Sequence, residues 1–404
     1  MNRCMKEFCR MTLSKKLIEN GKYCLEILHD HGFEAFFVGG CVRDQLIGRD
    51  IKDIDIATNA LPHEVKALFA ITVDIGIEHG TVLVLVNDIP IEITTYRQEE
   101  EYLLHRRPAS VHFVQNLSFD LMRRDFTMNA IAMSKNGDLI DPYKGEEDIK
   151  DLLIRAVGNP FERFSEDALR MLRGIRFTST LGFELEETTM SAIRSNRCLL
   201  QHISVERITK ELSSFFMGSY VKHGWKFLKE SKIAECFPIP LDVIPPIIEQ
   251  LSFASSIEGW SYLYQEHNEA GNVPIKFKFS KQEAKEYRIL STLLSVRKER
   301  VFRELDVFNQ QLSHILFAER FATTHDEISW TERKRDIEEM YHHLPIKQSS
   351  ELAVNGSDLL LWSERKPGPW MKNALRMLEE KVVSGVIENT KQAIKDEFLH
   401  EGTD

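Results

Sequence analysis

The chain has 404 residues, enough for two to four domains that each bury a core. Hydrophobic residues make up 43% and charged residues 28% of it, which is typical of a globular protein, and its longest apolar runs are too short to span a membrane. The formal net charge of −10 argues against nucleic-acid binding through overall charge alone, but it leaves room for a local basic track.

The N-terminus and the cysteines predict a cytoplasmic protein. The first residues contain no apolar stretch followed by a cleavage site, so they do not resemble a secretory signal. The chain has six cysteines: Cys4, Cys9, Cys24, Cys41, Cys198 and Cys236. Because they form no CxxC pair and have no regular spacing, reduced thiols are expected rather than a disulfide framework or a zinc site.

The first 160 residues predict an α/β region. A helical pattern at 15–29 and a strand at 34–38 lead through a Gly-Gly turn to a short helix at 41–48 and a second strand at 53–57. After a further helix at 62–69, β-branched runs follow at 71–78, 81–87 and 91–97. These runs indicate an antiparallel or mixed sheet.

From Phe161 onward the hydrophobic period predicts helices almost throughout. One helix is expected over 167–183, beginning near Ser165 or Asp167 and ending near Gly182. A proline-rich stretch at 236–248 predicts a linker, and residues 352–378 predict helix, turn and helix. The mixed-charge clusters at 297–304 and 332–339 are expected on solvated helix faces rather than on RNA phosphates.

Two aspartates alternate with isoleucines in the strand predicted at 53–57. Residues two apart in a strand share a face at roughly 7 Å, so Asp53 and Asp55 point to one side and the isoleucines to the other. Two close carboxylates repel each other unless a cation lies between them, and oxygen ligands suit Mg²⁺. The alternative is an exposed polar face on an edge strand.

The glycines upstream strengthen the cation interpretation. A strand leads into Gly39 and Gly40 and then into a short helix that carries Arg43. Free backbone N–H groups at a helix start, with an arginine beside them, suit the phosphates of a nucleoside triphosphate. An ordinary glycine turn is the alternative.

Glu92 is the candidate for a third acid, because it alternates with isoleucines in its own predicted strand. Three acids on adjacent strands can hold two metal ions, roughly 3.5 to 4 Å apart. A cross-strand salt bridge is the alternative interpretation.

Four stretches together, at 38–58, 123–133, 141–149 and 166–177, resemble the bacterial class II tRNA nucleotidyltransferases, the CCA-adding enzymes. The resemblance is close over the first 220 residues and weaker toward the C-terminus. It implies an α+β protein in which a polymerase-β-like nucleotidyltransferase head with a mixed or antiparallel sheet (1–160) precedes an all-helical neck (161–220), body (221–330) and tail (331–404).

The resemblance also implies the site and its ligands. It makes Asp53 and Asp55 the metal ligands, with Glu92 as a third acid, and Mg²⁺ the cofactor. It assigns nucleotide contacts to Gly40, Arg43, Arg124, Asp125, Asp167, Arg170, Arg173 and Arg176. The implied partners are CTP, ATP and the tRNA acceptor arm, with no membrane, and a homodimer is left open.

Asp167 and Arg170 have a direct physical interpretation. On one helix, residues i and i+3 share a face. Cytosine and adenine both present an amino donor beside an unprotonated ring nitrogen, so a carboxylate next to a guanidinium fits both and clashes with uracil and guanine. A solvated basic stripe is the alternative for the arginine series.

The resemblance separates two related activities. Bacterial poly(A) polymerases carry a basic stretch where this chain has residues 76–84, which look like the CCA side, and CC-adding enzymes lack an intact flexible loop. Residues 96–114 predict a long polar loop that ends in Arg106 and Arg107. Leu103 to His105 replace the acidic residue that relatives usually place there. An idle RNA-binding protein with the same fold is the alternative from a different class.

Overall fold

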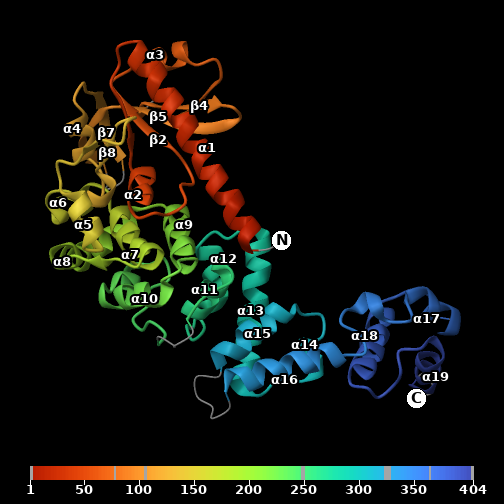
Figure 1. The fold of residues 1–404 in the computed structure, drawn as a ribbon. Coiled ribbons are helices and arrows are strands. Elements are labelled where there is room, and N and C mark those ends of the chain that lie inside the picture. The colour runs from red at the N-terminus through yellow and green to blue at the C-terminus, as the bar shows by residue number, and fades with distance from the viewer. Residues whose placement is uncertain are drawn as a thin grey trace. The chain divides into compact units, whose positions relative to one another are not determined.

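The computed structural model describes residues 3–76, 79–103, 107–246, 251–322, 329–363 and 365–401 (Figure 1). Two compact units divide the chain: residues 1–256 with 276–278, and residues 257–275 with 279–404. Within the described part, no helix is both long and apolar enough to cross a bilayer. The predicted boundaries at 160, 220 and 330 stay predictions.

A seven-stranded mixed sheet forms the centre of the N-terminal region, in the order β3-β4-β5-β2-β1-β8-β9. Its strands are β1 (Ala35–Val38), β2 (Asp55–Thr58), β3 (Thr72–Gly76), β4 (Thr81–Val86), β5 (Ile89–Thr95), β8 (Ala132–Met133) and β9 (Leu139–Ile140). Strands β2 and β5 are parallel, and the other neighbours are antiparallel. The predicted mixed sheet is confirmed.

Helix α1 (Arg3–Asp30) lies on the isoleucine face of the sheet and contacts β1, β2 and β5 (Figure 1). Ile54 and Ile56 are buried on this face. Gly21 lets the helix approach, because a Cβ there would lie 2.5 Å from the Phe37 ring and 3.1 Å from Ile54. The burial of this face explains the alternating isoleucines.

The opposite face of β2 presents Asp55 and Ala57. Ala57 belongs to a buried cluster with Val38, Tyr96 and Leu121. The helices of this region are α2 (Gly40–Leu46), α3 (Pro62–Leu68), α4 (Leu117–Met122), η2 (Thr127–Asn129) and α5 (Gly145–Lys150). The apolar cluster thus covers one end of the face and leaves Asp55 at its other end.

Residues 97–103 and 107–113 are paired strands, so the prediction of a polar loop over 96–114 is wrong for these two segments. Strand β6 (Arg97–Leu103) pairs antiparallel with β7 (Arg107–Phe113), and Val114 N donates to Tyr96 O at 2.9 Å. A polar sequence can form such a ladder because backbone groups make it, and Pro108 is tolerated on an edge strand.

Helices follow, as predicted. They are α6 (Pro160–Glu166), α7 (Leu169–Leu181), α8 (Glu187–Asn196), η3 (Arg197–His202), α9 (Val205–Phe216), α10 (Val221–Glu230) and η4 (Ile233–Cys236), with a short parallel pair β10 (Leu153–Ile154) and β11 (Glu184–Leu185). Gly182 follows the last residue of α7 with φ 77°, as the sequence predicts for that helix end. Helix α7 contacts both α9 and α10.

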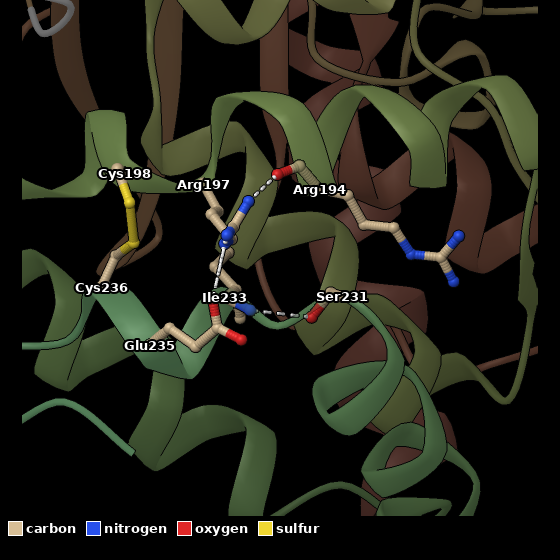
Figure 2. Close-up of a disulfide and its surroundings, with 7 residues drawn as sticks. All are labelled: Arg194, Arg197, Cys198, Ser231, Ile233, Glu235 and Cys236. Carbon is tan, nitrogen blue, oxygen red and sulfur yellow. Dashed lines mark hydrogen bonds and ion pairs between the residues drawn. A yellow bond between two sulfur atoms is a disulfide. The ribbon is translucent and has the colours of Figure 1, made fainter. Parts of the chain in front are cut away.

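Cys198 and Cys236 form a disulfide, so the prediction that all cysteines are reduced is wrong for these two (Figure 2). Their Cα atoms lie 5.1 Å apart although 38 residues separate them in the sequence. The fold brings η3 and η4 together, and that proximity leaves no spacing signal in the sequence.

The C-terminal unit is helical. Its helices are α11 (Ser256–Leu263), η5 (Ala270–Asn272), α12 (Val273–Lys276), α13 (Lys281–Glu299), α14 (Glu304–Val307), α15 (Leu312–Ala322), α16 (Trp330–His343), η7 (Ser349–Glu351), α17 (Gly356–Ser363), α18 (Trp370–Val383) and α19 (Lys391–Glu401). The predicted helix, turn and helix near the C-terminus correspond to α17 and α18.

Two arginines of the mixed-charge clusters are buried, so the prediction of solvated helix faces is wrong for these two residues. Arg297 Nε donates to Glu319 Oε2 at 2.6 Å, and Arg333 Nη1 donates to Glu319 Oε1 at 3.0 Å. The glutamate joins α13, α15 and α16, and a buried charge needs such a partner.

Candidate active site

The Gly-Gly turn lies beside the acids. Gly39, with φ 73°, ends β1 and precedes α2, which begins at Gly40. A Cβ at Gly39 would lie 3.0 Å from Arg124 Nη1 and 3.4 Å from Asp55 Oδ2. Positive φ and this close approach both favour glycine. The predicted phosphate turn and the predicted metal ligand are therefore neighbours.

Asp55 and Glu92 face each other across parallel strands. Asp55 is the first residue of β2 and is in register with Glu92 of β5, where Glu92 N donates to Ile54 O at 3.1 Å. Asp53 is exposed and precedes the strand, so its predicted place within the strand is wrong. The ladder with β1 starts only at Ile56, because the chain leaves β1 at the glycine turn.

The environment of Asp55 changes the pKa of its carboxyl group. Burial, together with the negative charges of Asp53 and Glu92, raises the pKa of Asp55 to about 6, and the positive charge of Arg124 opposes this shift. In the described ranges, no three His, Cys, Asp or Glu side chains are grouped as a metal site. A cation here would therefore need further ligands, such as phosphate oxygens.

Asp120, which sequence reasoning missed, orients Arg124. Arg124 Nη2 donates to Asp120 Oδ2 at 3.0 Å, and Arg123 Nη2 donates to Asp120 Oδ1 at 2.8 Å. Burial acts to raise the pKa of Asp120, but the two guanidinium groups outweigh it and the pKa is lowered. The i+3 and i+4 spacing from Asp120 to the paired arginines was the available signal.

Asp125 is held in a fully bonded network. Arg173 Nε donates to Asp125 Oδ2 at 2.7 Å, and the Asn129 side chain and Phe126 N donate to Oδ1 at 2.9 and 2.8 Å. Burial acts to raise the pKa of Asp125, but the Arg173 charge and these hydrogen bonds lower it to about 2. Asp125 therefore links the head region to α7.

Arg43 also has protein partners. Its Nη1 donates to Asn129 Oδ1 at 2.8 Å, and its Nη2 donates to Asp44 Oδ1 at 2.7 Å. The guanidinium lies close to Gly40, since a Cβ at that glycine would be 3.7 Å from Arg43 Nη2. Arg43 thus stands at the start of α2, as predicted, but its charge is shared with Asp44.

Three of the predicted arginines lie around one buried ring, that of Phe177. The guanidinium carbons of Arg43, Arg173 and Arg176 lie 5.1, 5.6 and 4.2 Å from the centre of the Phe177 ring. Arg176 Nε also donates to Glu211 Oε2 at 2.6 Å. With each guanidinium paired or stacked, the series is not a solvated basic stripe.

Asp167 and Arg170 do not share a helix face, so that prediction is wrong. Helix α7 begins at Leu169, and Asp167 precedes it in an extended conformation, where its Oδ1 accepts from Leu169 N at 3.0 Å. Arg170 instead donates to Glu166 Oε2 at 2.9 Å and to Arg123 O at 2.8 Å. The Asp167 carboxylate thus accepts a hydrogen bond from the first turn of α7 and is not part of a helix face.

Helix α9 supplies two partners that sequence reasoning missed. Arg207 Nη2 donates to Asp167 Oδ2 at 3.2 Å, and Glu211 accepts from Arg176. Their i, i+4 spacing places both on one face of α9, but no local pattern in the sequence pointed to their partners, which lie 40 and 35 residues away. The predicted loop residue Arg106 lies outside the described residues. Arg107 begins β7.

Three family models match the chain. They are described as the Poly A polymerase head domain (residues 35–155), the probable RNA and SrmB-binding site of polymerase A (182–240) and the putative tRNA nucleotidyltransferase domain 2 (251–398). Together these matches follow the chain from its sheet to its C-terminal helices.

Several similar proteins are CCA-adding enzymes. The CCA-adding enzyme of Bacillus mycoides is 42% identical over 381 residues, 92% of this chain and 96% of the relative. A structure of the Bacillus stearothermophilus CCA-adding enzyme in complex with CTP matches with a TM-score of 0.81 and 36% identity, covering 95% of this chain and 97% of that one. The Thermotoga maritima CCA-adding enzyme complexed with tRNA, at 19% identity, TM-score 0.68 and 94% coverage of both chains, shows the shared fold.

Proposed function

Because the chain belongs to the family of CCA-adding enzymes, the tRNA nucleotidyltransferases, we propose that it adds and repairs the 3′-terminal CCA of tRNA. The substrates are CTP, ATP and the tRNA acceptor arm, and no nucleic-acid template is used. The enzyme works in the cytoplasm.

The observation that carries this proposal is the set of acids beside the glycine turn. The tRNA 3′-hydroxyl attacks the α-phosphate in line, and pyrophosphate leaves. Gly40 and Arg43, at the start of α2, receive the triphosphate, and the preceding Gly39 brings the backbone close to Asp55 and Arg124. The carboxylate oxygens of the acids support this proposal, because they are suitable ligands for a metal ion at the triphosphate.

A divalent metal ion is typical of this family, and we propose Mg²⁺. The residues fit it, because burial and repulsion from Asp53 and Glu92 raise the pKa of Asp55, and a cation would stabilise the charged carboxylate against both. Asp53 and Asp55 would hold the ion, with Glu92 as the third acid. When bound, the ion supplies Lewis-acid chemistry at the phosphate and at the attacking hydroxyl.

Nucleotide selection is proposed for the start of α7. Asp167, just before α7, accepts from the amino group of cytosine or adenine. Arg170, in the first turn of α7, donates to the ring nitrogen in exchange for one of its bonds to Glu166 and Arg123 O. Arg207 holds Asp167 at 3.2 Å and sets the direction of the carboxylate. Arg173 and Arg176 complete the nucleotide-binding set.

The test offers tRNA lacking A, CA or CCA with CTP and ATP, separately and together, and measures product lengths. We expect growth to stop at CCA, with incorporation that depends on Mg²⁺ and is lost on chelation. A long A tail would instead indicate a poly(A) polymerase, the activity named by the family model of the head. Failure to bind CTP in a calorimetric titration would indicate an idle RNA-binding relative.

A further inference from the structure

One pair of cysteines stands apart from the proposed reaction. Cys198 is exposed and Cys236 is half-buried, so their disulfide is open to solvent. Cys24 and Cys41, in contrast, are buried, and burial raises the pKa of both thiols to about 12. Thiol reactivity follows thiolate character and access. Among these four residues, only Cys198 and Cys236 are placed for exchange.

An ion pair and a hydrogen bond also connect the segments around the two cysteines. Arg197 of η3 donates from Nε and Nη2 to Glu235 Oε2 of η4, at 3.1 and 3.0 Å (Figure 2). Arg194 Nε, on α8, donates to Glu230 O at the end of α10, at 2.9 Å. None of these contacts involves a sulfur atom, so none of them requires the disulfide. The two thiols would therefore stay adjacent and ready to form the bond again.

The disulfide closes a loop that contains α9 and α10. Helix α9 carries Arg207, which bonds Asp167, and Glu211, which bonds Arg176. A cross-link removes conformational freedom from the opened states of the loop that it closes. The bond therefore acts on the segment that positions two of the nucleotide-contacting residues.

We propose that Cys198 and Cys236 are a reversible thiol–disulfide site, and that its oxidation tethers η3 to η4, at the two ends of the segment that contains α9 and α10. The oxidant is a low-molecular-weight disulfide. The consequence for nucleotide selection rests on the proposed function, and the cytoplasmic location makes the bond reversible rather than permanent. The tether itself depends neither on the proposed function nor on the cytoplasmic location.

The exchange is balanced in two steps. The Cys198 thiolate attacks one sulfur of the small disulfide, which releases one small thiolate and leaves a mixed disulfide on Cys198. The Cys236 thiolate then attacks the Cys198 sulfur and displaces the second small thiolate. The two protons lost by the cysteines end on the two released thiols. A small thiol in excess reverses both steps.

The first experiment maps the bond in the full-length protein. The enzyme is equilibrated with oxidised or reduced glutathione, its free thiols are alkylated under denaturing conditions, and its peptides are analysed by mass spectrometry. We expect a bridged Cys198–Cys236 peptide after oxidation and two alkylated residues after reduction. Alkylation of both residues in the oxidised sample would overturn the proposal.

The second experiment measures the tether. Oxidation should raise the thermal midpoint of the wild type by about 5 °C, from the usual effect of a disulfide that closes a loop of this size. Cys198→Ser and Cys236→Ser should both show the reduced midpoint in either buffer. A bridge without a shift, or an equal shift in the variants, would refute the tether.

An activity arm separates the two proposals. The temperature at which CTP incorporation is half lost should rise with the midpoint in the oxidised wild type. A wild type that is inactive in both states would refute the proposed function, while the midpoint would still test the tether. A midpoint shift with an unchanged inactivation temperature would refute the link between the tether and CTP incorporation.

Discussion

The acids of the sheet and the charges around α7 shift the pKa of a buried aspartate in opposite directions. At the sheet, burial and two neighbouring carboxylates raise the pKa of Asp55 to about 6. At α7, Arg173 and the surrounding hydrogen bonds overcome burial and lower the pKa of Asp125 to about 2. In the first region the positive charge of Arg124 does not offset burial and the two carboxylates, so the region suits a cation from outside. The second is already neutralised and suits a positioning role.

The strongest test of this contrast is Asp55→Asn. We expect the rate of CTP incorporation to fall by about a thousandfold or more, because the change removes a ligand charge needed at the developing transition state. Rates measured under single-turnover conditions give the effect. Asp50→Asn is the matched control, since Asp50 is exposed and precedes the acids. Near-normal activity of Asp55→Asn would refute the two-carboxylate assignment.

The same chemical change should have opposite effects on stability in the two regions. In a chelating buffer, Asp125→Asn should lower the free energy of unfolding by about 2 kcal/mol, and Asp55→Asn should raise it by up to about 2 kcal/mol. Losing the Arg173 partner explains the first effect. Removing a buried charge and its repulsion from Asp53 and Glu92 explains the second. Urea unfolding measures both. Equal signs would remove the distinction between the regions.

Selection of the base should depend on the region of paired charges around α7. Asp167→Ala should reduce discrimination against UTP and GTP by about tenfold, roughly the value of one lost hydrogen bond to a base, with little change in tRNA affinity. Arg207→Gln should act in the same direction with a smaller effect, because it only positions the carboxylate. Competition between labelled CTP and UTP measures the ratio. Unchanged selectivity would leave Asp167 with a structural role alone.

The smallest effect is a dependence of stability on pH. The folded protein takes up a proton at Asp55 near pH 6, above the ordinary range of an unfolded aspartate. Without divalent metal, lowering the pH from 7 to 5 should therefore add about 1 kcal/mol to the free energy of unfolding from this group. The difference between the wild type and Asp55→Asn isolates it. A flat difference would contradict the raised pKa.

Local patterns predicted the sheet and much of the site. The period of two at β4 and β5, and the Gly182 end of α7, are properties of adjacent residues, so one sequence contains them. The neighbourhood of the glycine turn and Asp55 also follows from a short stretch. These features need no knowledge of distant partners.

Contacts between distant residues explain what the sequence could not predict. The Cys198–Cys236 bond spans 38 residues, and Glu319 meets Arg297 and Arg333 from three different helices. The position of Asp167 depended on where α7 begins, and helix boundaries are the least reliable part of a sequence-based prediction. In each case the tertiary partner decides the outcome.

The Phe177 ring has a consequence for how this enzyme can evolve. Arg43 approaches the ring from α2, while Arg173 and Arg176 approach it from α7. A substitution at position 177 alters the surroundings of a triphosphate residue and of two base-side residues in one step. Positions 43 and 177 should therefore change together among relatives, and drift at either one alone should be rare.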